Sequence, residues 1–171
     1  EKLPGQFSLG TRTTLSLFNG DDNNSAGVGV GGQFRIQFSN KINSEWFADF
    51  ITSSVGNVAS RNDYHIGWSL MYYPGKNVHF NRPFQPYLLA GHCFDYTKVA
   101  EQKNTSNYAH RLSMATQAGL GTHININPRF DCSVSVQYMI HFGKDIETTI
   151  DKENVIIEKK KLSTPDGHLL L

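Results

Sequence analysis

Long apolar runs, cysteine and an excess of charge of either sign are all scarce in this chain of 171 residues. No stretch of about 18 consecutive apolar residues occurs, which excludes a membrane-spanning helix. The 16 basic and 15 acidic side chains nearly cancel, so no overall field would attract nucleic acid. Helical periodicity is nearly absent as well, which leaves β-structure as the predicted class.

Cysteine is represented by Cys93 and Cys132 alone, without a Cys-x-x-Cys pair. Two cysteines cannot form a metal site by themselves. The strand order developed below places them two strand spacings of about 4.8 Å apart, which exceeds the usual Cα separation of a disulfide. We therefore predict two packed free thiols and no disulfide.

A secretory signal is missing from the start of the sequence, EKLPG, which has neither an apolar core nor a small-residue cleavage site. We expect a mature protein whose signal peptide has been removed. The length corresponds to one domain by the usual prior of roughly 100 to 200 residues, so a single domain is predicted over 1–171.

Alternation of apolar and polar residues is the main feature that is present. Residues 27–38 show it best, because Val28, Val30, Phe34 and Ile36 alternate with glycines, Gln33, Arg35 and Gln37. Such period-two segments, bounded by Asn, Asp, Gly and Ser, predict strands. The other expected strands are 7–18, 45–55, 64–73, 85–99, 111–126, 130–142 and one that begins near Asp166. Connections are expected at 19–26, 40–44, 56–63, 74–83, 101–107 and 127–129, and the charged residues 143–165 are expected to form strand extensions joined by a loop.

The polar face of these strands distinguishes two architectures. A soluble barrel or sandwich exposes its polar face to water, where Lys and Glu are the common residues. Here that face holds Gly, Ser, Gln, Arg and His instead, while lysines gather in the loops. This composition suits the narrow lumen of a membrane barrel, whose strands must close so that every backbone amide is paired. We predict an all-β, eight-stranded antiparallel up-and-down transmembrane β-barrel.

Two further patterns agree with this prediction. Aromatic residues lie near the expected strand ends, where interfacial girdles would be placed. They are Phe7, Phe18, Phe38, Trp46, Tyr64, Tyr72, Tyr73, Tyr87, Phe130 and Phe142. Short turns also alternate with longer polar connections, as short periplasmic turns and long outer loops would.

The segments GVGVGGQFRIQF, PYLLAGHCFDY and ATQAGLGTHININPRFDCSVSVQYMIHFG, taken in this order, resemble the OmpA-like family of eight-stranded outer-membrane barrels, often described as porin-family or outer-membrane β-barrel proteins. The resemblance covers nearly the whole chain and implies an integral protein of the Gram-negative outer membrane. One departure is the ending His168-Leu169-Leu170-Leu171, because such barrels usually finish on an aromatic residue. The last strand is therefore expected to be incomplete, or closure depends on something else.

The predicted site is a polar network inside the barrel rather than a catalytic, cofactor or metal site. An eight-stranded barrel is just wide enough for its own side chains, so this network should plug the lumen and no wide pore is expected. Its predicted members are Arg12, Gln33, Arg35, Gln37, Glu45, Asp49, His65, Gln117, His123, Gln137 and His141. The predicted lipid-facing residues are Leu15, Val30, Phe34, Ile36, Trp68, Leu120, Val134, Val136 and Ile140.

Enzymatic chemistry finds little support in the sequence. None of the 7 histidines lies in a His-x-x-x-His or His-Glu-x-x-His pattern, and His79 and His168 are interpreted as turn residues. The His-x-Ser-Asn stretch that outer-membrane lipid A deacylases share is absent, and the nearest approximation, His110 to Ser113, has the wrong spacing.

We therefore expect a non-enzymatic, cofactor-free accessory or structural barrel that contacts outer-membrane lipid and displays loops to other envelope proteins, as a complex subunit. Two alternatives stay open. The first is a lipid-modifying barrel enzyme, which needs a histidine and a serine or carboxylate on the lipid-facing surface. The second is a soluble lipocalin-like carrier, in which the apolar faces would line a ligand cavity.

Overall fold

The structure is a computed structural model of residues 1–171. It describes residues 5–18, 26–55, 59–74, 83–104, 106–127, 129–142, 146–151, 154–159 and 166–171. Within these ranges no helix has the length and apolar character needed to cross a membrane.

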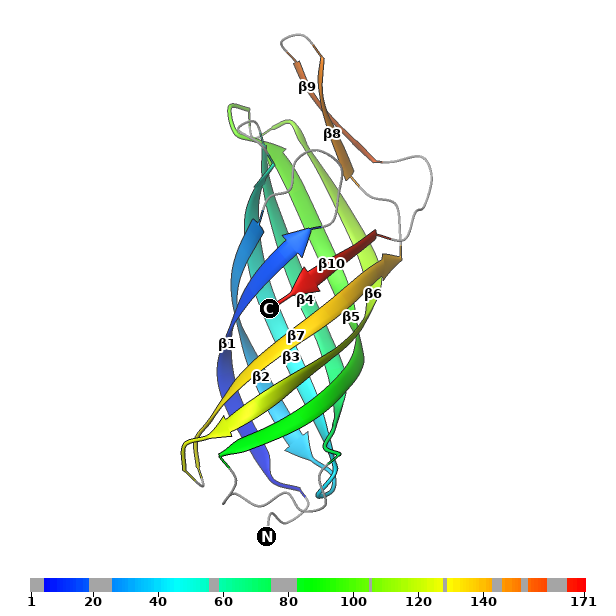
Figure 1. The fold of residues 1–171 in the computed structure, drawn as a ribbon. Helices are drawn as coiled ribbons and strands as arrows, with labels where there is room; N and C mark the ends of the chain where they lie inside the picture. The colour runs from blue at the N-terminus through cyan, green and yellow to red at the C-terminus, as the bar shows by residue number, and fades with distance from the viewer. Residues whose placement is uncertain are drawn as a thin grey trace.

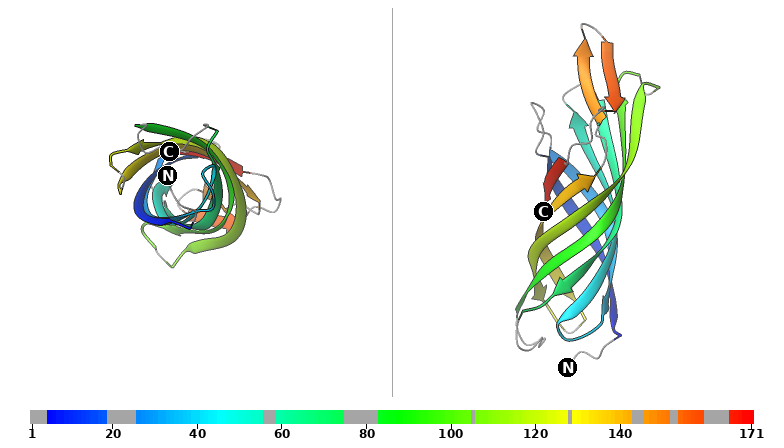
Figure 2. Two further views of the ribbon diagram at one scale, coloured as in Figure 1. Left: turned by 90° about the horizontal axis from the view of Figure 1, so that it is seen from below. Right: turned by 90° about the vertical axis from the view of Figure 1, so that its right-hand side faces the viewer.

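Eight strands form a closed barrel, which Figure 1 shows from the side and Figure 2 from below. They are β1 (Phe7–Phe18), β2 (Ala26–Gln37), β3 (Ile42–Val55), β4 (Ala59–Tyr72), β5 (Phe84–Glu101), β6 (Tyr108–Asn125), β7 (Asp131–Phe142) and β10 (Asp166–Leu170). Each pairs antiparallel with the next along the barrel, and β10 pairs with both β7 and β1 to close it. The predicted eight-stranded antiparallel up-and-down barrel is confirmed.

Some strand boundaries differ from those predicted. β4 starts at Ala59 rather than at Tyr64, so the loop predicted at 56–63 is wrong for residues 59–63. β3 starts at Ile42, which replaces most of the turn predicted at 40–44. Most of the extra strand residues are polar, but they pair with the neighbouring strand, and this pairing outweighs the weak intrinsic β-propensity of residues such as Asn43 and Asp63.

The charged segment after β7 is also organised differently from the prediction. β8 (Ile146–Asp151) and β9 (Asn154–Lys159) pair with each other in a separate two-stranded sheet rather than extending the barrel strands. Figure 1 shows this hairpin standing beyond the end of the barrel that lies opposite the N-terminus. Residues 19–25 of the loop predicted at 19–26 and the turn residue His79 lie outside the described residues, and Ala26 already belongs to β2. The interpretation of His168 as a turn residue is wrong, because it lies in β10.

Short polar turns at the opposite end explain two of the reversals. Ser39 Oγ accepts hydrogen bonds from the backbone N–H groups of Lys41 and Ile42. Asn127 Oδ1 accepts from Arg129 and Phe130 in the same way. Asn and Ser favour turns because their side chains can satisfy backbone donors locally. The sequence signals at NKINS and NPR thus mark real chain reversals.

The two faces of the barrel wall have opposite character. Large apolar side chains point outward, as Leu112 and Leu120 do with exposed fractions of 73% and 61%. Charged and polar side chains point inward and are buried, together with a few apolar ones such as Ile51 and Met139. Gly67 makes room for this filling, since a Cβ there would lie 2.8 Å from the Phe47 ring and 2.5 Å from the Cβ of Cys93. The interior is a packed core, and most of the apolar surface lies outside.

Candidate functional site

Near the end of the barrel with the short turns, an arginine and two tyrosines surround a histidine. Arg35 on β2 forms an ion pair of 2.6 Å with Asp131 at the start of β7. Its guanidinium also lies 3.0 Å from a ring nitrogen of His123. That ring stacks on Tyr87, with 4.6 Å between centroids, and lies 3.0 Å from the Tyr73 hydroxyl. We call these five residues the lower cluster.

In the middle of the barrel, Arg12 bridges from β1 to β3. Its Nε lies 3.1 Å from Asp49 Oδ1, and a terminal nitrogen lies 3.5 Å from Glu45 Oε1. The guanidinium also lies 4.5 Å from the centre of the Phe47 ring. The face of an aromatic ring attracts a cation, so this contact stabilises the charged arginine. Glu45 and Asp49 are both about 95% buried, so this cation faces two carboxylates that are largely shielded from bulk water.

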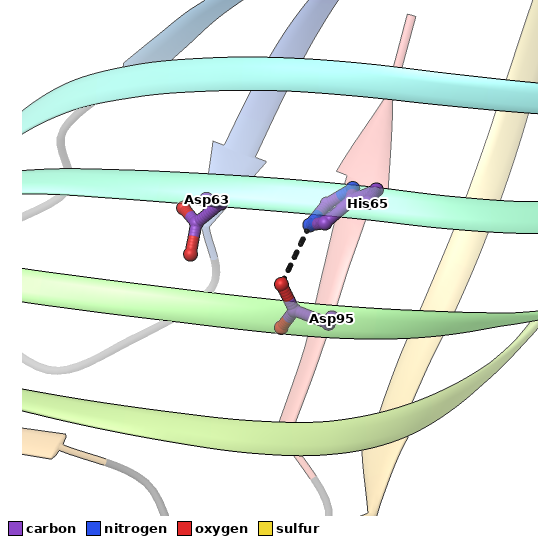
Figure 3. A group of neighbouring side chains, drawn as sticks. All are labelled: Asp63, His65 and Asp95. Carbon is purple, nitrogen blue, oxygen red and sulfur yellow. Dashed lines mark ion pairs between the residues drawn. The ribbon is translucent and has the colours of Figure 1, made fainter.

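Towards the hairpin end, Asp95 on β5 is the centre of a second charged group. Its carboxylate lies 3.1 Å from His65 Nε2, 3.1 Å from His141 Nδ1 and 3.6 Å from a terminal nitrogen of Arg111. Asp63 lies beside His65 on β4, as Figure 3 shows. We call these five residues the upper cluster. They come from four strands, so only the closed barrel brings them together.

Three members of the upper cluster could in principle hold a metal ion. Ligand atoms of Asp63, His65 and Asp95 lie within 4.8 Å of one another, and His and carboxylate ligands suit zinc. However, Arg61 pairs with Asp63 at 2.9 Å, and Arg111 faces Asp95. Each carboxylate thus already has a cationic neighbour, and a divalent cation would add uncompensated charge in a buried site. The residues present fit a self-neutralised network better than a metal centre.

Nucleophilic catalysis is not supported by the upper cluster either. Ser113 Oγ donates to Asp95 Oδ2 over 3.3 Å, so the carboxylate contacts both the serine and the histidines. A catalytic triad requires the opposite order, with histidine between serine and acid. On the outer wall, His92 is paired across the sheet with Trp68 and Thr116, and none of these supplies a carboxylate.

The residues predicted for the lumen network all lie on the inner side of the wall. Gln37, Glu45, Asp49, His65, Gln117, His123, Gln137 and His141 are buried, whereas Arg12, Gln33 and Arg35 are partly buried. The ion pairs and hydrogen bonds divide most of them between the lower cluster, the Arg12 bridge and the upper cluster, and Gln117 donates separately to Ser69 over 2.7 Å.

Most residues predicted to face lipid are exposed on the outer wall. These are Leu15, Val30, Phe34, Trp68, Leu120, Val134 and Val136, while Ile36 and Ile140 are half-buried on the same face.

Two girdle predictions are wrong. Tyr73 and Tyr87 are 2% and 4% exposed and line the lumen. Their hydroxyls find polar partners there, as Asn43 donates to Tyr73 and Ser133 lies 2.7 Å from the Tyr87 oxygen. A buried tyrosine hydroxyl usually has such a hydrogen-bonding partner. Whether a residue faces the lumen or the outside depends on its place in the alternation of the strand and not on its distance from the strand end.

The cysteine prediction is partly confirmed. Both thiols are free, as predicted. Cys93 is buried in the lumen, but Cys132 is exposed, so its description as a packed thiol is wrong. Cys132 belongs to the outward-facing set of β7.

Sequence reasoning missed the two central acids of the upper cluster. The sequence predicts a loop at Asp63, and its alternation leaves open which face of the strand 85–99 carries Asp95. The alternation of residues along β5 could have revealed Asp95. One face of the strand carries Tyr87, Leu89, Cys93, Asp95 and Thr97, and the other carries Leu88, Phe94 and Tyr96. Placing the aromatic and aliphatic set outward would have turned Asp95 inward.

Comparison with known proteins identifies no family. No family model matches the chain, and no curated protein matches it either. Among solved structures, the attachment invasion locus protein Ail of Yersinia pestis aligns over 99% of this chain and 100% of its own, with 13% sequence identity and a TM-score of 0.45. A similarity of this degree carries no argument about function, and the resemblance to the OmpA-like family stays a prediction.

Proposed function

We propose that this protein is a non-enzymatic integral barrel of the bacterial outer membrane, which holds extracellular loops and contacts other envelope proteins. The observation that carries the proposal is that the barrel has its apolar side chains outside and its charged side chains inside, the reverse of a soluble protein. Outward-facing Val30, Leu112 and Leu120 are each more than half exposed, whereas inward-facing Asp95 and His65 are 0% and 1% exposed. An apolar exterior around a polar interior is stable in lipid and unfavourable in water.

Closure of the wall supports the same location. A lipid bilayer offers no water to unpaired backbone groups, so strands cross it only as closed barrels. With 12 to 18 residues, β1 to β7 exceed the roughly 9 to 11 residues that a tilted strand needs to span the hydrocarbon layer. The extra length would carry the strands beyond the membrane towards the β8–β9 hairpin (Figure 1).

A solute pore is disfavoured by the filling of the lumen. The Arg12 bridge, the two clusters and apolar side chains such as Ile51 and Met139 occupy the interior. An eight-stranded barrel has no spare width for a channel beside them. The barrel therefore supports a role in display rather than in permeation, with the β8–β9 hairpin as the described segment placed to meet a partner.

The alternative functions agree less well with the geometry. A soluble lipocalin-like carrier needs an apolar cavity, but the described interior is lined by ion pairs. A lipid-modifying enzyme needs an acid–base pair on the lipid-facing wall, and His92 has no carboxylate across either neighbouring strand.

Heat-modifiability tests the proposal directly. The protein, folded in mild detergent, should migrate differently on a dodecyl sulphate gel with and without boiling, and should float with liposomes through a density gradient. Vesicles that contain it should stay impermeable to small sugars. A soluble, monomeric protein that neither shifts nor floats would overturn membrane insertion, whereas sugar leakage would overturn the plugged lumen.

A further inference from the structure

A histidine lies on the outer wall of the barrel in the middle of its apolar band. His92 is the ninth of the 18 residues of β5, and Thr116, directly opposite it, is the ninth of the 18 residues of β6. Outward-facing apolar side chains lie on both sides of this pair along each strand, and they are Leu88, Phe94, Met114 and Leu120. The two polar side chains therefore lie far from either end of the lipid-facing wall.

The imidazole of His92 has no hydrogen-bonding partner within the described part of the chain. Its ring contacts Phe94 edge-on, with 5.3 Å between centroids, and none of the described residues exchanges a hydrogen bond with it. An imidazole always carries at least one N–H donor, and an unpaired polar group is costly in hydrocarbon. Ionisable side chains within a membrane normally face a partner rather than lipid. His92 thus marks a place where the wall meets a partner that forms hydrogen bonds.

The surface beside His92 and Thr116 is low. Ala90 and Ala118 are outward-facing and lie opposite each other on the same two strands. A methyl group projects less than the leucines and aromatic rings around it, so a second wall can approach the backbone here. Within membranes, small residues allow such close packing, and neighbouring polar residues add hydrogen bonds to it.

We propose that these four residues, Ala90, His92, Thr116 and Ala118, form the interface between two copies of the chain that lie side by side in the membrane. We call them the β5–β6 patch. The copies are related by a two-fold axis along the membrane normal, which passes between the two strands, so β5 of each copy faces β6 of the other. The inference rests on the proposed membrane location, and it identifies a second copy as a protein that the barrel contacts.

A two-fold axis gives every residue of the patch a suitable partner. In such an interface, each contact between two different residues occurs twice, once in each direction. Because His92 is paired with Thr116 in the register of β5 and β6, His92 of each copy meets Thr116 of the other. A threonine hydroxyl can accept from the imidazole N–H or donate to the bare ring nitrogen. Two equivalent hydrogen bonds result, and both imidazoles are satisfied.

The flanking apolar residues match in the same way. Phe94 lies opposite Met114, and Leu88 lies opposite Leu120. Around the axis, Phe94 of one copy meets Met114 of the other, and contacts between sulfur and an aromatic ring are favourable. Lipid tails are as apolar as leucine, so these residues contribute van der Waals packing rather than a hydrophobic driving force. The two His92–Thr116 hydrogen bonds therefore provide the specificity.

Other occupants satisfy the patch less well. A lipid acyl chain offers neither a donor nor an acceptor to the imidazole. A different membrane protein would need a polar group of its own at the matching depth, whereas a second copy supplies one by symmetry.

Sedimentation equilibrium of the full chain in a density-matched mild detergent measures the association. The parent protein should form a reversible dimer. His92→Leu should weaken the dimer at least about tenfold because it removes both interfacial hydrogen bonds, and Thr116→Val should act in the same direction with little change in shape. Both variants should keep the heat-modifiable form, since leucine and valine suit a lipid-facing position. The matched control is His110→Leu, which removes the other outward-facing histidine of these two strands and should leave the dimer unchanged.

Cross-linking tests the two-fold arrangement. Ala90→Cys and Ala118→Cys are made separately, each together with Cys132→Ser to remove the exposed thiol. The two proteins carry different tags, are mixed in liposomes and are treated with a short bis-maleimide. The axis brings residue 90 of one copy to residue 118 of the other, so mixed dimers should be at least about fivefold more abundant than when Val30→Cys replaces Ala118→Cys. Val30 faces outward on β2, away from the axis.

The outcomes separate this interface from membrane insertion. Parent protein that shifts on heating and floats with liposomes, yet stays monomeric at every concentration, would overturn the interface alone. Dimers of His92→Leu as tight as those of the parent would do the same, as would equal cross-linking of Ala90→Cys with Ala118→Cys and with Val30→Cys. Parent protein that neither shifts nor floats would instead overturn membrane insertion, and the interface with it.

Discussion

Removal of the Asp95 carboxylate tests whether the upper cluster is a buried charge network. Asp95 is fully buried and contacts His65, His141 and Arg111. Breaking a buried ion pair from one side leaves the other charge uncompensated and typically costs about 3–5 kcal/mol. We therefore expect Asp95→Ala to lower the free energy of unfolding by about that amount.

Urea titration of the barrel in liposomes measures this loss. With a denaturant slope of about 1–3 kcal/mol per molar urea, the unfolding midpoint should fall by at least about 1 M. Lys103→Gln, on an exposed turn, is the charge control and should stay within about 0.5 kcal/mol of the parent.

A double variant separates the charge from the packing. Asp95→Ala with Arg111→Met removes the carboxylate together with its arginine partner, and it should recover part of the lost stability because one fewer buried charge is left uncompensated. The reasoning is refuted if Asp95→Ala shifts the midpoint no further than Lys103→Gln does, since the cluster would then be solvated. A double variant less stable than Asp95→Ala would instead show that Arg111 stabilises the barrel through other contacts.

Three further outcomes are expected. Leu120→Arg places a charge on the outward wall and should cost about 2–4 kcal/mol in liposomes if Leu120 lies at the bilayer midplane; a neutral result, measured by the same titration, would contradict a lipid-facing position. A small maleimide should modify Cys132 but not Cys93 in folded, detergent-solubilised protein, and mass spectrometry that finds Cys93 modified first would contradict the packed lumen. Gly67→Leu should abolish the heat-modifiable form, because its side chain would overlap Phe47, and a normal gel shift would show that the lumen has unfilled space there.

The sequence by itself determined the barrel class and most of its strands. Period-two alternation fixes which residues share a face, and the Arg35–Gln37 stretch without lysine reveals that the polar face is the inner one. Turn chemistry at residues 39–42 and 127–130 likewise depends on local hydrogen bonds, which neighbouring residues specify. These signals act within one strand or one turn, so they can be read from the chain directly.

The tertiary structure alone decided which lumen residues meet. His65, Asp95, Arg111 and His141 come from four strands, and their contact depends on the stagger of each strand against the next around the whole barrel. Local patterns specify which face of a strand a residue lies on. Its position along the barrel axis depends on the register of every neighbouring strand pair, and these registers are set only when the barrel closes.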